Sequence, residues 1–206
     1  MEELIVTKAK ELFFTYGLKA VSMDDIAKHT GVSKKTIYKD FEHKNQLVHQ
    51  LVTELLLCHK QALDQCSVEA RDAVDEVLLS TQAPFNTIAA IHPGFFYELE
   101  KFFQPVWQLT TIHRRQVLIP SIIQNLEKGI AAEVYRPEMD IPFVTDLRVQ
   151  QILTAINPRT FTDRKIPAKK LMLQLSEFYL YGIATPKGKK LINKYINDHN
   201  EQQFSI

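Results

Sequence analysis

The fold is decided by the stretch SMDDIAKHTGVSKKTIYKDF, which runs from Ser22 to Phe41. Ser22 is a favourable N-cap, and the two aspartates after it favour the positive end of a helix dipole. Gly31 stands where a tight turn needs a left-handed residue, and Ser33 can cap a second helix. Ile37 and Phe41, four residues apart, would bury the inner face of that helix. The stretch therefore predicts two short helices, at about 23–30 and 34–41, joined by a tight turn.

The outer face of the second helix carries lysines, because Ile37 and Phe41 point inward. Its first turn is the part that meets base edges when such a helix enters the major groove of DNA. Lysine can donate to guanine, and the methyl group of Thr36 can touch thymine. Tyr38 and Lys39 are placed for phosphate contacts, which orient the protein without specifying sequence. The predicted DNA-binding residues are Ser22, Ser33, Lys34, Lys35, Thr36, Tyr38, Lys39 and Lys44.

The spacing of Ala27, Gly31 and Ile37, four and then six residues apart, is that of a general helix-turn-helix. The longer run from about Leu4 to Leu51 resembles the TetR family of regulators, with Gly31-Val32-Ser33, Thr36-Ile37-Tyr38, Phe41 and Lys44 in matching places. The resemblance implies a DNA-binding head, a long fourth helix and a second domain that dimerises and binds an inducer.

Two residues depart from the family pattern. Asp40 stands where a basic or neutral residue is more usual, so it could repel phosphate or pair with Lys39 or Lys44. His43 stands where a serine cap is common, which predicts a weaker start to the fourth helix. A plain three-helix packing unit, in which Tyr38 covers the core, is the alternative interpretation of the same stretch.

Composition is that of an ordinary globular chain: 206 residues, 45% hydrophobic, 24% charged and a net charge of +1. The whole chain is therefore no polybasic nucleic-acid binder. Between Lys28 and Lys44, however, five lysines stand against Asp40 and Glu42, a local excess of three. A small DNA-reading head on a larger neutral body has this distribution. No apolar run is long enough to cross a membrane, and we expect a cytoplasmic protein with no membrane partner.

Helical periodicity dominates the chain. Only six glycines occur, β-branched residues do not alternate, and all nine prolines lie from Pro84 onward. The predicted fold class is all-α, a three-helix head joined by a long helix to a larger helical domain. We expect a DNA-binding domain over 1–46 and an effector-binding and dimerisation domain over 47–206. The predicted helices are 2–16, 23–30, 34–41, 44 into the sixties, 69–83, 94–103, 106–131, 142–156, 168–183 and 187–200.

The predicted helix 168–183 is apolar over most of its circumference, so two of its faces should be covered. One face can cover the chain's own core, and the other predicts a partner subunit. The resemblance implies that this helix pairs with 142–156 in a four-helix bundle across a two-fold axis, although a central helix of a monomer is the alternative. The predicted interface residues are Phe143, Leu147, Leu171, Leu175, Phe178 and Tyr179. The last helix could dock on its own body or on the partner.

Six aromatic residues fall between Phe95 and Trp107. They could line a pocket for an apolar or aromatic effector, with polar anchors nearby, or they could simply be core. The predicted effector-binding residues are Phe95, Phe96, Tyr97, Phe103, Trp107 and His113.

The sequence holds no motif for catalysis or for a metal. None of the seven histidines forms an HxxxH pair or joins a CxxC, and there is no GxSxG or phosphate-cradling glycine loop. We therefore expect no catalytic residue, no metal site and no cofactor. Cys58 and Cys66 are eight residues apart on one predicted helix, about 12 Å, which is too far for a disulfide.

Together these features predict a sequence-specific DNA-binding transcriptional regulator that is not an enzyme. We expect a repressor that acts as a homodimer on a palindromic operator and is released by a small apolar or aromatic effector. Two other classes stay open: a helical adaptor or small-molecule carrier that keeps the head for packing, and an enzyme on an all-helical body.

Overall fold

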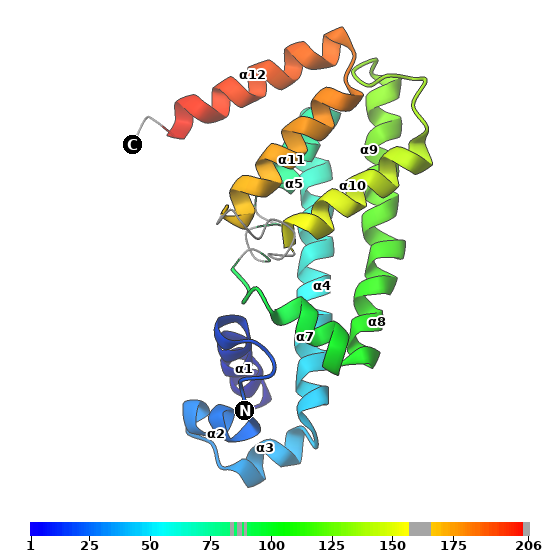
Figure 1. The fold of residues 1–206 in the computed structure, drawn as a ribbon. Helices are drawn as coiled ribbons and strands as arrows, with labels where there is room; N and C mark the ends of the chain where they lie inside the picture. Colours follow the sequence, from blue (N-terminus) through cyan, green and yellow to red (C-terminus); the bar gives the residue numbers. More distant parts are fainter. Residues whose placement is uncertain (83–84, 86–87, 89, 157–165, 204–206) are drawn as a thin grey trace. The chain divides into compact units, whose positions relative to one another are not determined.

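The computed structural model describes residues 1–206 except 83–84, 86–87, 89, 157–165 and 204–206 (Figure 1). Its described residues form helices and contain no strand; Tyr135 and Ala184 make one isolated bridge. The all-α fold class is confirmed. The helices are α1 (Glu2–Tyr16), α2 (Met23–Thr30), α3 (Lys34–Asp40), α4 (Lys44–Glu69), α5 (Ala73–Ser80), α7 (Phe95–Phe102), α8 (Gln104–His113), α9 (Ile119–Ala131), α10 (Ile141–Ile156), α11 (Ala168–Ile183) and α12 (Pro186–Gln203).

Two predicted boundaries are wrong, each for a local reason. The helix predicted over 69–83 begins at Ala73, because the Asp72 carboxylate caps α5 by accepting hydrogen bonds from the N–H groups of Val74 and Asp75. The helix predicted over 106–131 begins earlier and is divided by a π-helical turn, Arg114–Leu118. Pro120 follows that turn in the first turn of α9, where its missing N–H is tolerated. Because Pro120 has no N–H, it cannot donate a hydrogen bond to the carbonyl four residues earlier. The wider π-helical turn accommodates this missing hydrogen bond.

The chain packs into two compact units. The first, which we call the head, comprises Met1–Lys60 and Ala90–Arg114. The second, the body, comprises Gln61–Ala89 and Arg115–Ile206. The predicted functional boundary between residues 46 and 47 does not coincide with this division, and it stays a prediction.

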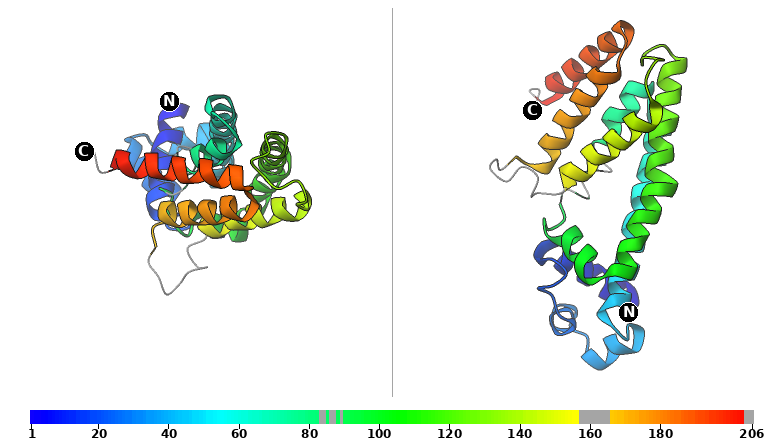
Figure 2. Two further views of the ribbon diagram at one scale, coloured as in Figure 1. Left: turned by 90° about the horizontal axis from the view of Figure 1, so that it is seen from above. Right: turned by 45° about the vertical axis from the view of Figure 1, so that its right-hand side comes forward.

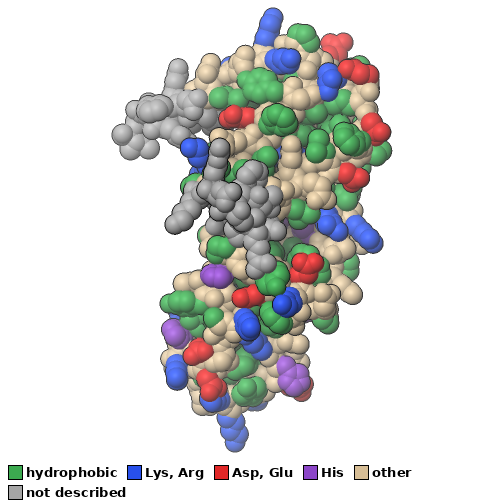
Figure 3. Space-filling model, viewed as in Figure 1, with side chains coloured by type: hydrophobic (Ala, Val, Ile, Leu, Met, Phe, Trp, Pro, Cys, Tyr) green, Lys and Arg blue, Asp and Glu red, His purple; other side chains and the backbone are tan. Residues whose placement is uncertain are grey.

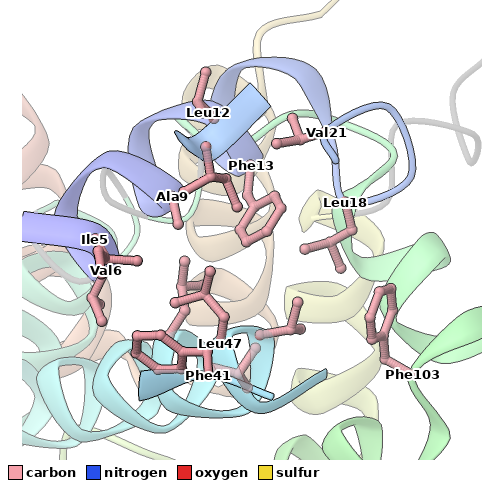
Figure 4. Packing of buried hydrophobic residues seen from close by; sticks show 14 of the residues in the cluster. Ile5, Val6, Ala9, Leu12, Phe13, Leu18, Val21, Phe41, Leu47 and Phe103 are labelled. Atoms are coloured by element: carbon pink, nitrogen blue, oxygen red, sulfur yellow. The ribbon is translucent and has the colours of Figure 1, made fainter. Parts of the chain in front are cut away.

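The head is built around the inner faces of α1 to α4. Side chains from α1, among them Ile5, Ala9 and Phe13, point toward Leu47 of α4 and Phe41 (Figure 4). All five are buried, and Gly17 ends α1 with a positive φ of 87°. The three short helices therefore have one continuous core.

The segment 90–114 completes the head. Phe95, Leu99 and Phe103 are buried in the same core as α1 and α4. The N–H of His92 donates to the carbonyl of Phe14 at 2.7 Å, and the Glu98 carboxylate accepts from the N–H of Lys19 at 2.8 Å. Polar contacts thus fix this segment to the α1–α2 connection.

The body has its own core, in which α10 and α11 lie side by side (Figure 2). Tyr135 is fully buried, and its hydroxyl donates to the carbonyl of Ala73 at 2.9 Å. Its ring lies against Gly129, where a Cβ atom would stand 2.0 Å from the ring. Helix α12 docks on its own body, because Ile192 and Tyr195 are buried.

Candidate DNA-binding head

The turn between α2 and α3 has the predicted geometry. Gly31 is left-handed, with φ 69° and ψ 11°, a conformation that costs little only for residues without a Cβ atom. Ser22 and Asp25 form a reciprocal capping box at the start of α2. The Ser33 hydroxyl accepts from the N–H of Thr36 at 3.1 Å and so caps α3. These contacts fix the angle at which α3 leaves the turn.

Helix α3 buries one face and exposes the other. Ile37 is fully buried and Phe41 is 4% exposed. Lys34, Lys35 and Lys39 are exposed, and Tyr38 has 46% of its surface accessible. In the space-filling view, basic side chains reach the lower tip of the head, where α3 lies in Figure 1 (Figure 3). The face predicted for the DNA groove is therefore open to solvent.

Several of the predicted contact residues on α3 already have partners within the head. The Lys34 ammonium forms a surface ion pair with Asp24 of α2, in which both side chains are about half exposed. Exposed pairs of this kind are weak, so Lys34 can exchange the carboxylate for a DNA group. The Thr36 hydroxyl lies 2.8 Å from that of Ser33. Among the head contacts described, none pairs Lys35 or Lys39 with an acidic side chain.

Lys44 has a structural task that sequence reasoning missed. Its ammonium donates to the backbone carbonyls of Leu18 and Val21 and lies over the rings of Phe13 and Phe103. Burial lowers the pKa of Lys44 below the usual lysine value. These contacts turn the charge toward the head rather than toward a phosphate, and they leave Asp40 without the predicted Lys44 partner.

The start of α4 is stabilised by a residue other than His43. The side-chain amide oxygen of Gln46 accepts from the N–H of Glu42 at 2.7 Å. The N–H of Gln46 in turn donates to the carbonyl of His43 at 3.0 Å. The Gln46 side chain, in the first turn of α4, thus supplies part of the backbone hydrogen bonding that a serine cap would supply.

Residues 5–51 of this chain match the family model for bacterial regulatory proteins of the tetR family. Over these residues the chain is similar to the tetR family. The matched segment contains the Gly31 turn, all of α3 and the first turns of α4. A curated relative, the uncharacterized HTH-type transcriptional regulator YhgD of Bacillus subtilis (strain 168), is 28% identical over 139 residues. That alignment covers 65% of this chain and 64% of the relative.

Solved structures share the fold over most of this chain. A TetR-family transcriptional regulator from Marinobacter aquaeolei VT8 has a TM-score of 0.76 at 14% identity and covers 96% of this chain and 98% of its own. The regulator FadR from Bacillus subtilis, in complex with stearoyl-CoA, has a TM-score of 0.69 at 18% identity and covers 89% of this chain and 100% of its own. At these identities the likeness shows the fold alone.

The aromatic segment is divided between core and surface. Phe95 is fully buried and Phe103 is 7% exposed, and the ring of Phe95 meets those of Phe14 and Phe96 edge-on at 5.6 and 5.4 Å. These rings help to build the core of the head. Tyr97 is 40% exposed, and Trp107 is half-buried against the same core. Phe95 and Phe103 are therefore core residues, which is the alternative to a pocket that the sequence left open.

His113 has a partner that sequence reasoning missed. Its Nε2 lies 2.9 Å from Nδ1 of His59, and the two rings meet edge-on at 5.1 Å. Burial, and then the neighbouring His113, lower the pKa of His59 to about 4; burial also lowers the pKa of His113. The pair is therefore neutral at pH 7 and connects α4 to α8. The two histidines are 54 positions apart in the sequence, so no local signal predicts this contact.

The predicted dimer residues also divide into two groups. Phe143, Leu147 and Phe178 are exposed, by 64%, 45% and 75% of their surfaces. Leu171 and Tyr179 are buried inside the protomer's own body, and Leu175 is half-buried against Leu171 and its neighbours. The exposed members leave large apolar side chains on α10 and α11 in contact with water. As with the DNA contacts, their role in an interface stays a prediction.

Proposed function

We propose that the chain is a transcriptional repressor that binds a palindromic operator as a homodimer through α3. The observation that carries the proposal is the open face of α3, with Lys35, Tyr38 and Lys39 directed away from the core by the Gly31 turn. Similarity to the tetR family over residues 5–51 supports the same function, and a curated relative is named as a transcriptional regulator. A two-fold axis would present two such helices to half-sites one DNA turn apart.

The proposed dimer uses the exposed part of α10 and α11. Phe143, Leu147 and Phe178 supply the apolar surface that a partner subunit would cover. An isolated exposed leucine needs no explanation, but several large apolar side chains on two adjacent helices favour an interface. Leu171 and Tyr179 would support that surface from within rather than touch the partner.

The proposed effector is a small molecule with a large apolar part. The complex of FadR with stearoyl-CoA shows that a neighbour of this fold holds an acyl ligand. As effector contacts, Phe96, Tyr97, Trp107 and His113 stay predictions, while Phe95 and Phe103 are expected to act as core. Effector binding would favour a conformation with lower operator affinity, which requires the effector to bind the two conformations unequally.

The test begins with selection of binding sites from random duplex DNA by the full-length protein. We expect an enriched palindrome whose affinity falls steeply with salt, because phosphate contacts release counterions. On that site the double variant Lys34→Ala/Lys35→Ala should lose about 2–4 kcal/mol of binding free energy, and Tyr38→Phe should weaken all sequences by similar amounts.

A matched control is Lys189→Ala/Lys190→Ala, which removes two adjacent exposed lysines from α12. This control should bind the operator as the unaltered protein does. If the Lys34/Lys35 variant also binds unchanged, α3 does not enter the groove. If selection returns no enriched sequence, the head serves for packing, and an adaptor or carrier is the better description.

A further inference from the structure

Arg148 is a cation buried inside the body, and its contacts with the described residues include no acidic side chain. It lies on α10 with 3% of its surface exposed, and it is the only cation among the buried residues that the structure describes. Its Nη2 donates to the hydroxyl of Ser176 at 2.8 Å, and its guanidinium lies over the ring of Tyr179 at 4.8 Å. The contact with Gln151 is long, at 3.5 Å. None of these partners carries a negative charge.

A second unsatisfied polar group lies one helical turn away. Thr145 is 3% exposed, and its Oγ1 has no hydrogen-bond partner among the described residues. Residues three apart on a helix are neighbours on one face, so Thr145 and Arg148 lie on the same side of α10. A hydroxyl and a guanidinium are both hydrogen-bond donors. The Thr145 hydroxyl lacks an acceptor among the described residues, and the guanidinium has only the neutral acceptors Ser176 and Gln151.

Burying the charged guanidinium of Arg148 is unfavourable unless an opposite charge compensates it. A ring face and one hydroxyl compensate only part of the lost hydration. Burial lowers the pKa of Arg148 to about 10, although the nearby Tyr179 and Tyr135 act in the opposite direction. The direction of this shift is that of a cation whose surroundings do not balance its charge. An anion placed against the guanidinium and the Thr145 hydroxyl would supply the compensation that Ser176 and the Tyr179 ring do not.

The surroundings decide which kind of anion fits. One guanidinium balances one negative charge, whereas a phosphate monoester carries nearly two at neutral pH. Carboxylates accept two parallel N–H bonds from arginine. Apart from three tyrosines, the buried core cluster of the body consists of apolar side chains, among them Val144, Val149 and Leu180. A molecule with one carboxylate and an apolar remainder matches both features.

We propose that Arg148 and Thr145 bind the carboxylate of a small apolar acid in the body of this protein. The acid replaces the long contact with Gln151 and accepts from the guanidinium and from the Thr145 hydroxyl. Calling this acid an effector rests on the proposed function, whereas the binding of the acid does not. The site also differs from the predicted aromatic segment, because Arg148 belongs to the body and Phe95–Trp107 to the head.

The experiment measures acid binding to the full-length protein by calorimetry at pH 7.5. The probes are hexanoate, decanoate, hexadecanoate and phenylacetate, each paired with the alcohol of the same skeleton. We expect at least one acid to bind about tenfold or more tightly than its alcohol, because hydrogen bonds to charged groups are the strong ones. Arg148→Met should lose this preference, and Thr145→Val should reduce it several-fold.

The matched control is Arg115→Met, which removes an exposed arginine of the same unit and should keep the preference for acids. Equal preference in Arg148→Met, or no acid that binds the unaltered protein better than its alcohol, overturns the proposal.

Thermal unfolding without any ligand gives a second readout. An arginine that only holds α10 to α11 should lower Tm when removed. If Arg148 and Thr145 await a ligand, Arg148→Met and Thr145→Val should unfold at the same or a higher temperature than the unaltered protein. A clear fall of Tm in Thr145→Val contradicts an unpaired hydroxyl even if Arg148→Met fails to fold. Operator binding is measured separately, so a failure to bind DNA would count against the repressor and leave the acid site standing.

Discussion

Individual lysines of the head have separable tasks. Lys35 is exposed on α3, whereas the Lys44 ammonium supplies hydrogen bonds to two backbone carbonyls of the α1–α2 connection. Both residues lie in the segment that matches the TetR family model. A loss of DNA binding on mutation would therefore have different causes at the two positions.

Lys44→Ala should destabilise the head by about 1–3 kcal/mol, because it leaves the carbonyls of Leu18 and Val21 without their donor. The measurement is urea unfolding followed by the emission of Trp107, the single tryptophan, which packs against the head core. Lys35→Ala is the comparison: its unfolding midpoint should stay the same while its operator affinity falls. A Lys44→Ala protein with unaltered stability and weakened DNA binding would instead support the phosphate contact predicted from the sequence.

Among the helical elements, α4 and α8 are joined by an acid-sensitive contact. Burial holds the pKa of His59 at about 4, below the ordinary histidine value, and His113 and Lys60 are the charged or titratable neighbours that act on the pair. The unfolded chain therefore binds more protons than the folded one between about pH 6.5 and 4. Stability from this contact is complete above the upper end of that range and is lost as the pH falls.

We expect the head to lose about 2 kcal/mol of unfolding free energy through His59 between pH 7 and pH 5. Urea unfolding at both values, followed by Trp107 emission, gives the pH dependence of the unaltered protein. His59→Gln keeps a polar side chain but does not titrate, so subtracting its pH dependence removes the effect of the carboxylates. Parallel curves for the two proteins would show that His59 is as accessible to protons in the folded state as in the unfolded one.

At this scale most of the fold could be predicted, because helix signals are local. Capping residues, Gly17, Gly31 and apolar periodicity placed the first four helices correctly. Pairing between distant segments could not be predicted from such signals. The aromatic residues after Phe95 have the pattern of either a pocket or a core, and only their contacts with α1 show that Phe95 belongs to the core.

The candidate DNA-binding site could also be predicted only where its signals are local. The exposed lysines of α3 follow from the inward positions of Ile37 and Phe41, which periodicity gives directly. The inward direction of Lys44 depends on carbonyls more than twenty residues away. Arg148 gave no signal, because one arginine in an apolar helix usually reaches the surface, and only the tertiary packing around α10 buries it.

For the whole molecule, the proposed dimer makes a direct prediction. Phe178→Glu puts a charge in the middle of the exposed apolar surface of α10 and α11, and a charge buried without a partner opposes association. We expect light scattering after gel filtration to give the mass of a monomer, and affinity for the full palindrome to fall toward that for a half-site. Phe102→Glu, at a phenylalanine of α7 that is 47% exposed, should remain dimeric. A dimeric Phe178→Glu protein would place the interface elsewhere.

Because Gly129 and Tyr135 are in contact, the residues that each of these positions can hold depend on the other position. The Tyr135 hydroxyl donates to the carbonyl of Ala73 of α5 and contacts Asn125 of α9, and its backbone pairs with Ala184 after α11, so the residue joins three parts of the body. Even a methyl group at position 129 would collide with the Tyr135 ring. Substitution at either site is therefore not neutral by itself. In descendants of this sequence, a bulkier residue at 129 should be accompanied by a smaller one at 135.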